Sequence, residues 1–234
     1  MSLPEDLQKE LSHIIVSLKS HVESQQLSGI QHFYSRPAEV SVARPGGSEK
    51  PELLLNLRAE LGDCRRCALC NGRKNIVFGE GDPDAGLMFI GDGPDADDDA
   101  QGRPCAGKAG QLLTRIIKAI QLERSQVYIS NILKCRPSEN RDPEGAETQT
   151  CLPFLKKQIE IIAPRIICAL GTFAAQALLG TDREMPELRG RFHALGDMLV
   201  MPTYHPAYLL SHEEKKKETW KDMQMVQQEY VKGL

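Results

Sequence analysis

One nonapeptide, Leu87-Met88-Phe89-Ile90-Gly91-Asp92-Gly93-Pro94-Asp95, decides how the rest of the chain is interpreted. Its apolar half is too short for a helix and is bounded by a turn signal, which is typical of a buried strand. The glycines that follow permit a tight turn and a close approach of the backbone. The stretch therefore predicts a strand that ends in an acidic, glycine-rich loop.

Three more apolar runs follow this pattern, and helical segments separate them. The runs are Val127–Leu133, Arg165–Leu170 and Met198–Met201. Apolar residues recur at helical spacing in Lys108–Gln121 and Glu147–Ile162, and a polar helix is predicted at Glu213–Val231. Strands that alternate with helices of this length predict βαβ units, hence a parallel sheet covered by helices on both faces.

Each predicted strand ends in a segment of unusual chemistry. The segments are Gly91–Asp95, Asn131 with Lys134–Pro137, Gly171-Thr172 and Thr203–Pro206. Ligands of open α/β sheets bind outside the carboxyl ends of the strands. An acid, an amide, a glycine turn and His205 are therefore expected to converge there. A lone histidine is more often structural, so the hypothesis for His205 depends on this company.

An acidic run, Asp97-Asp98-Asp99, follows the first of these segments. Amide groups at the start of the helix at Lys108 could meet an anion or a carbonyl group. Taken alone, however, an acidic loop is more often a solvated turn or a weak divalent-ion site than a catalytic element.

The seven cysteines of the chain need an explanation. In a reducing compartment they are more often thiols or metal ligands than disulfides, and an odd number cannot pair fully. Cys64, Cys67 and Cys70 form a C-x-x-C-x-x-C run of the kind that zinc and iron–sulfur sites require. The wider spacing of Cys135 and Cys151 favours a cluster that spans two elements over a zinc ribbon. Buried apolar cysteines are the alternative.

Composition bounds the architecture but not the function. The chain has 234 residues, 41% of them apolar, and a net charge of −3, which neither indicates nor excludes a nucleic-acid ligand. Residues 1–50 predict an amphipathic helix and a flexible linker, which could hold a protein partner, and residues 51–234 predict the α/β domain. The apolar runs are too short for a membrane span and no secretory signal is evident, so we expect a cytoplasmic protein. We also expect a monomer.

An ordered series of motifs resembles the family 4 uracil-DNA glycosylases, from about residue 58 to 228. The series is Cys64-x-x-Cys67, Gly79–Gly81, Gly91–Pro94, Gly102–Pro104, Gly107–Leu113, Asn131–Pro137, Asn140-Arg141, Ala169–Gly171, Leu188–Arg191 and His205–Leu210. The resemblance implies a three-layer α/β/α sandwich with a mostly parallel four-stranded sheet. It implies DNA base-excision repair, in which uracil is flipped out and its N-glycosidic bond hydrolysed. It also implies a [4Fe–4S] cluster on four of the cysteines, with Cys70 outside: Cys64, Cys67, Cys135 and Cys151.

The resemblance assigns roles to single residues. His205 would donate to the uracil oxygen that gains charge, Asn131 would read the uracil edge, and Asp92 would help to place water. Tyr208 and Leu209 would fill the gap left by the flipped base. Further contacts with the base or its DNA are implied for Gly91, Gly93, Asp95, Cys105, Arg103, Lys108 and Asn140.

Three positions depart from the family pattern. Asp92 replaces a glutamate, Asp95 replaces a glycine, and Cys105 stands where a phenylalanine would stack on uracil. An ionised Asp95 near the base needs a partner or a raised pKa. Lost stacking is worth roughly 1–3 kcal/mol, hence about one to two powers of ten in binding. Two alternatives therefore accompany uracil excision: a DNA-binding relative with little cleavage, and a glycosylase with shifted base specificity.

Overall fold

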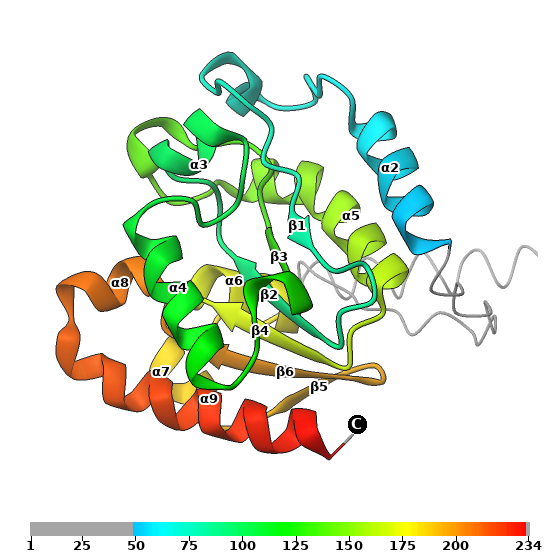
Figure 1. Ribbon diagram of the computed structural model, residues 1–234. Coiled ribbons are helices and arrows are strands. Elements are labelled where there is room, and N and C mark those ends of the chain that lie inside the picture. The colour runs from blue at the N-terminus through cyan, green and yellow to red at the C-terminus, as the bar shows by residue number, and fades with distance from the viewer. Residues whose placement is uncertain (1–48, 233–234) are drawn as a thin grey trace, which may run out of the picture. The chain divides into compact units, whose positions relative to one another are not determined.

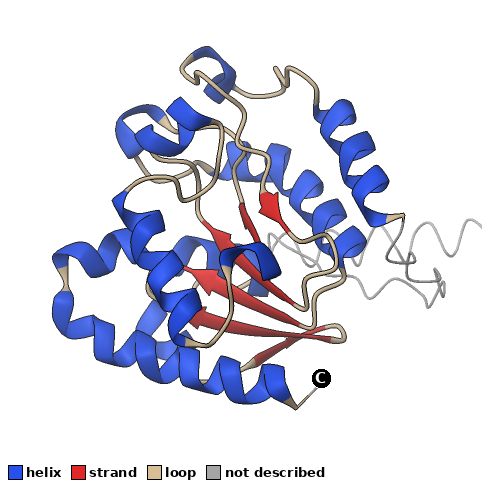
Figure 2. Cartoon of the chain, viewed as in Figure 1, coloured by secondary structure: helices blue, strands red, loops and turns tan. Residues whose placement is uncertain are grey.

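The structure, a computed structural model, describes residues 49–232. The middle of its sheet consists of four parallel strands that match the predicted ones: β2 (Leu87–Gly91), β3 (Tyr128–Asn131), β4 (Ile166–Leu170) and β6 (Met198–Thr203). Their arrowheads point in the same direction, so their carboxyl ends lie together (Figure 2).

The sheet has six strands, so the prediction of four strands was wrong. Antiparallel β1 (Glu80–Gly81) and β5 (His193–Leu195) occupy its two edges, and the order is β1-β3-β2-β4-β6-β5. Segments of two and three residues are too short to show the alternation that marks a strand in a sequence.

Eight α-helices accompany the strands in the described part of the chain. They are α2 (Lys50–Leu61), α3 (Ala96–Gln101), α4 (Lys108–Ala119), α5 (Gly145–Ile162), α6 (Thr172–Leu179), α7 (Met185–Leu188), α8 (Pro206–Ser211) and α9 (Lys216–Val231). The three predicted helices are confirmed as α4, α5 and α9, the last one preceded by a short 3-10 turn. Within residues 49–232 no helix combines the length and apolar character that a membrane span requires.

Alternate side chains of β2 build two separate cores. Met88 and Ile90 pack in the core that also contains side chains of α5, α6 and α7. Leu87 and Phe89 pack in the opposite core, with side chains of α4 and α9. Figure 1 shows α4 and α9 on one side of the sheet and α6 on the other. The structure thus confirms three α/β/α layers, and burial on both faces explains the uninterrupted apolar run of β2.

A third apolar cluster lies beside the cysteine motif. Leu57 and Leu61 of α2 pack with Phe154 of α5, and cysteines line the same cluster. Helix α2 was not predicted from its sequence, because leucines such as Leu55, 69% exposed, also occupy its outer face. Lys50, placed in the linker by the sequence, is the first residue of this helix. The rest of the helix and linker predicted for residues 1–50, up to residue 48, lies outside the described residues.

Candidate functional site

The carboxyl ends of the parallel strands bring Gly91, Asn131 and His205 together. Gly91 and Asn131 are register partners at the ends of β2 and β3, and His205 follows β6. A Cβ atom at Gly91 would lie 2.6 Å from Oδ1 of Asn131 and 3.3 Å from Nε2 of His205. The first distance is shorter than real Cβ atoms tolerate, so the site requires glycine at this position. We call Gly91, Asn131 and His205 the strand-end site.

Asn131 has a side-chain donor that no described residue uses. The residue is 2% exposed, and its Nδ2 atom is buried with no hydrogen-bond partner in the described residues. A buried donor without a partner costs about 1–3 kcal/mol. The carbonyl oxygen of a ligand at the strand-end site would satisfy it.

His205 presents a second neutral donor. Its side chain caps α8, because Nδ1 accepts a hydrogen bond from the backbone N–H of Ala207 at 3.2 Å. A neutral ring that accepts at Nδ1 carries its proton on Nε2, the nitrogen close to Gly91. Burial lowers the pKa of His205 to about 4, although the nearby Asp95 acts to raise it. At neutral pH the site therefore holds an uncharged imidazole with a donor N–H.

A buried ion pair fixes the strand that leads to His205. The Oγ1 hydroxyl of Thr203 donates to Asp222 of α9 at 2.7 Å, and Asp222 pairs with Arg189 at 2.8 Å. Asp222 has no exposed surface, and burial raises its pKa. The Leu188–Arg191 motif thus anchors the end of β6 rather than touching a ligand through Arg189.

Asp92 points to the start of α6. Its Oδ1 atom accepts the backbone N–H of Ala174 at 2.7 Å. Gly171 lies against the same carboxyl group at a φ of 101°, and a Cβ atom there would lie 2.7 Å from Asp92 Oδ2. Burial raises the pKa of Asp92 from 3.8 to about 7, while the amide of Ala174 acts to lower it. Asp92 therefore holds β2 to the turn after β4 and gains a proton near neutral pH.

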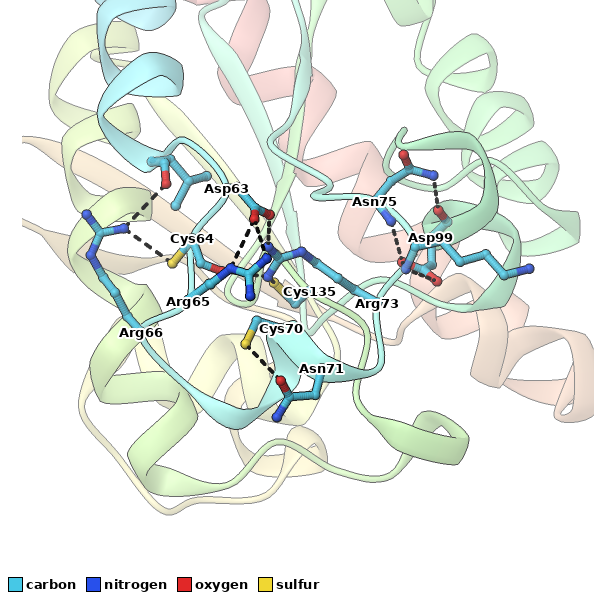
Figure 3. A network of polar contacts seen from close by, with 12 residues as sticks. Asp63, Cys64, Arg65, Arg66, Cys70, Asn71, Arg73, Asn75, Asp99 and Cys135 are labelled. Atoms are coloured by element: carbon cyan, nitrogen blue, oxygen red, sulfur yellow. Dashed lines mark hydrogen bonds and ion pairs between the residues drawn. The ribbon is translucent and has the colours of Figure 1, made fainter.

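The acidic run is a structural element in its buried part. Asp95 caps α3 by accepting the backbone N–H of Asp98 at 2.9 Å, which supplies the partner that the sequence demanded. Asp98 accepts the N–H of Ala106 at 2.7 Å, and burial raises its pKa to about 6. Asp99 accepts backbone amides of the segment at Asn75 (Figure 3). The prediction of a solvated turn or a divalent-ion site was wrong for Asp98 and Asp99.

Gly93 lies in the loop after β2, and Cys105 lies in the loop before α4. Cys105 is 8% exposed and belongs to the core with α4. Its backbone has a left-handed φ of 50°. Burial raises the pKa of its thiol to about 12. A Cβ atom at Gly93 would make only ordinary contacts with Leu133 and Pro137, so space alone does not demand glycine there.

The predicted DNA contacts fall into different environments. Arg103 is paired with Glu80 at 2.7 Å, whereas Lys108 is exposed at the first position of α4. Asn140 is exposed, and its Oδ1 accepts from Arg136 at 2.8 Å. Tyr208 is 39% exposed and stacks on His212 with ring centroids 3.9 Å apart.

Leu209, whose contact with DNA remains a prediction, is buried in this conformation. Leu209 is 1% exposed and packs in a core, because the turn of α8 directs it inward. Its neighbour Leu210 is 42% exposed. The exposed large apolar side chains of α8 are Tyr208 and Leu210.

A second candidate site is the cysteine cavity, lined by Cys64, Cys67, Cys135 and Cys151 with apolar side chains around them. Cys70 does not line it, and its thiol faces Asn71 instead (Figure 3). In the described residues no three side chains of the metal-binding types could hold a single metal ion. The four sulfurs share one cavity without converging on one point.

Nitrogen donors surround three of these four sulfurs. Arg66 donates to Cys64, Arg73 to Cys135, and the backbone N–H of Lys134 to Cys151, each at 3.3 Å. Figure 3 shows the two arginines beside their sulfurs. Burial raises the pKa of Cys135 to about 11, and Arg73 acts to lower it. The donors favour sulfur in its anionic, ligating form.

Lys134 and Gln158 form a buried polar pair that sequence reasoning missed. Lys134 is 1% exposed and its ammonium group donates to Gln158 Oε1 at 2.6 Å. Burial lowers the pKa of Lys134 to about 7, while Cys151 acts to raise it. No local signal could reveal the pair, because its members are 24 residues apart on different elements.

The sequence is similar to known proteins of one superfamily. Residues 78–224 match the family model of the uracil DNA glycosylase superfamily. The chain is 39% identical to a type-4 uracil-DNA glycosylase of Sulfurisphaera tokodaii over 75% of its own length and 84% of the relative. For type-4 uracil-DNA glycosylases of Saccharolobus solfataricus and Thermotoga maritima the identities are 41% and 39%, over 72% and 71% of this chain and 82% and 88% of the relatives. The chain therefore belongs to the uracil-DNA glycosylase superfamily and, within it, to the type-4 family.

Proposed function

We propose that this protein excises uracil from DNA by hydrolysing the N-glycosidic bond, as the names of its type-4 relatives indicate. The observation that carries the proposal is the pair of neutral donors at the strand-end site, Asn131 Nδ2 and His205 Nε2. Uracil offers two carbonyl oxygens, one for each donor. Cytosine offers an amino group in place of one of them, and two donors facing each other would disfavour it.

The proposed chemistry places negative charge on the departing base. His205 would donate Nε2–H to the uracil oxygen that gains this charge, and a fixed donor acts most strongly where charge develops in the transition state. A neutral imidazole suits this role, because it donates without giving up its proton. Asp95, which approaches His205, is already engaged as the cap of α3. We propose Asp92 for the placement of water, a role that its contact with α6 restricts.

The base must leave the duplex to reach this site. Flipping costs a few kcal/mol of lost stacking and pairing, which a side chain inserted into the helix can offset. We assign that insertion to Tyr208 and Leu210, the exposed large apolar side chains of α8, which begins directly after His205. Lys108 and Arg103 are proposed to contact the DNA backbone, with Arg103 exchanging Glu80 for a phosphate.

For the cysteine cavity we propose a [4Fe–4S] cluster held by Cys64, Cys67, Cys135 and Cys151. A four-iron cluster takes one thiolate at each of four corners, which suits four sulfurs that line one cavity but fit no single ion. The bound cluster would supply structural cross-linking between the segment after α2, the segment after β3 and α5. The cationic donors Arg66 and Arg73 suit its negative charge.

A second candidate function has its own support. A relative that binds uracil or another modified base in DNA with little cleavage is favoured by Asp92, whose carboxyl group is occupied by Ala174. Cys105 and Asp95 together favour shifted base specificity. A cytoplasmic location, a monomeric state and a protein partner for residues 1–50 remain predictions.

The test is incubation of the full-length protein with oligonucleotides that contain uracil, hypoxanthine or xanthine, single- and double-stranded, followed by alkali to reveal abasic sites. Cleavage of uracil DNA supports excision. Cleavage of only another base supports shifted specificity. Binding without cleavage of any substrate overturns the proposal in favour of the DNA-binding relative.

A further inference from the structure

Lys134 is the buried residue that the proposed chemistry leaves unexplained. Its ammonium nitrogen lies 2.6 Å from Ser130 Oγ, 2.8 Å from the backbone oxygen of Asn131 and 2.6 Å from Gln158 Oε1. No carboxylate pairs with it in the region that the structure describes. A lysine is rarely buried completely without such a partner, which marks this position as specialised.

All three of these contacts are donated by Lys134. Gln158 donates through Nε2 to the oxygens of Phe78 and Tyr128, so its Oε1 atom is an acceptor. The single proton of the Ser130 hydroxyl is directed to Phe78 or to Gln158. The ammonium group therefore joins α5 to the last two residues of β3, including the residue whose side chain reads the base.

The main chain of Lys134 faces the cysteine cavity. Its N–H donates to Cys151 Sγ at 3.3 Å, and its carbonyl oxygen accepts the N–H of Val77 at 2.8 Å. Cys135 is the next residue along the chain. One residue thus contacts Asn131 through its side chain and the wall of the cysteine cavity through its backbone.

We propose that Lys134 is a positioning residue for uracil recognition, which clamps the end of β3 so that the amide of Asn131 faces the base, and which connects this clamp to the cysteine cavity. The inference rests on the proposed function, because it concerns the same ligand. Replacing Lys134 does not remove the Asn131 side chain, but it frees the strand end that orients this side chain. The lost orientation weakens uracil binding by about tenfold, as expected for one hydrogen bond to a charged group.

The experiment is calorimetric binding of free uracil to the full-length protein, with visible absorbance reporting its cluster content. Lys134→Met removes the ammonium group at similar volume. Lys134→Met/Gln158→Met also removes the acceptor left behind, which keeps a folded variant available if the single one unfolds. The matched control is Lys157→Met, an exposed lysine on the same helix as Gln158, paired with Glu60 at 2.7 Å.

The expected result is a dissociation constant about tenfold higher in both Lys134 variants and unchanged in Lys157→Met. A purely structural role would reduce the folded or cluster-loaded fraction but leave the dissociation constant of that fraction unchanged. An affinity within twofold of wild type in either folded Lys134 variant overturns the inference. Wild type that binds uracil without cleaving uracil DNA contradicts the proposed excision but leaves this inference standing.

Discussion

The strand-end site and the cysteine cavity are both lined by side chains from distant segments, but they present opposite electrostatics. Asn131 and His205 are neutral donors, one without a partner and one with its tautomer fixed by a helix cap. Two sulfurs of the cysteine cavity instead accept from guanidinium groups, that of Cys64 from Arg66 and that of Cys135 from Arg73. Neutral donors suit an uncharged ligand whose charge appears only during the reaction, whereas cationic donors suit a permanently anionic group. This difference supports the proposals of a catalytic site at the strand ends and of a bound cluster in the cysteine cavity.

The largest effect should follow from breaking the cysteine cavity. We expect Cys135→Ala to lose bound iron and visible absorbance, and to lower the free energy of unfolding by several kcal/mol, because ligand binding is coupled to folding. Iron content and thermal unfolding measure it. Cys70→Ala is the control, since Cys70 lies outside the cavity. A colourless wild type with stoichiometric zinc after anaerobic purification would contradict the assignment.

The next largest effect belongs to the strand-end site. His205→Ala should lower the single-turnover rate of uracil release by on the order of 10²–10³, the usual cost of one transition-state donor. Asp92→Ala should cost less, because the Asp92 carboxyl group already serves Ala174. DNA binding is measured separately. If Asp92→Ala abolishes cleavage while His205→Ala is near wild type, the two roles are exchanged.

A smaller effect should appear in the pH dependence of stability. Asp92 has a pKa of about 7 in the folded protein, raised by burial from 3.8. As pH falls from about 8 to about 6, the folded protein gains this proton and the unfolded chain does not, so protonation stabilises the fold in that window. On acidification, the melting temperature of wild type should therefore rise relative to that of Asp92→Asn. Parallel curves for the two proteins would show that Asp92 is ionised throughout.

The smallest effect concerns Cys105, which the family pattern predicts to lie against the base. Cys105→Phe restores a stacking surface, so uracil affinity should rise by about tenfold. Because Cys105 is 8% exposed and packs with the α4 core, the larger ring should also lower the melting temperature. Uracil binding and thermal unfolding measure the two changes. A destabilised variant with unchanged uracil affinity would show that residue 105 faces only the core.

Much of the architecture could be predicted because its signals are local. The run Leu87–Ile90 and its counterparts identify the four parallel strands, and helical spacing identifies α4, α5 and α9. The strand-end segments correctly indicated where Asn131 and His205 would meet, since parallel strands share one carboxyl edge. β1 and β5 escaped prediction because they are two and three residues long.

The sequence by itself determined the family, the alternation of the four central strands with helices along the chain, and the cysteine spacing. Each of these depends on residues that lie close together or on motifs that follow in order. Only the tertiary structure decided which neighbouring side chain is buried, with Leu209 inside and Leu210 outside. It also decided that Asp99 holds a loop 25 residues away and that Lys134 joins Asn131 to Gln158. Such partners are chosen by the need of buried polar groups for hydrogen bonds, and that need is met across space rather than along the chain.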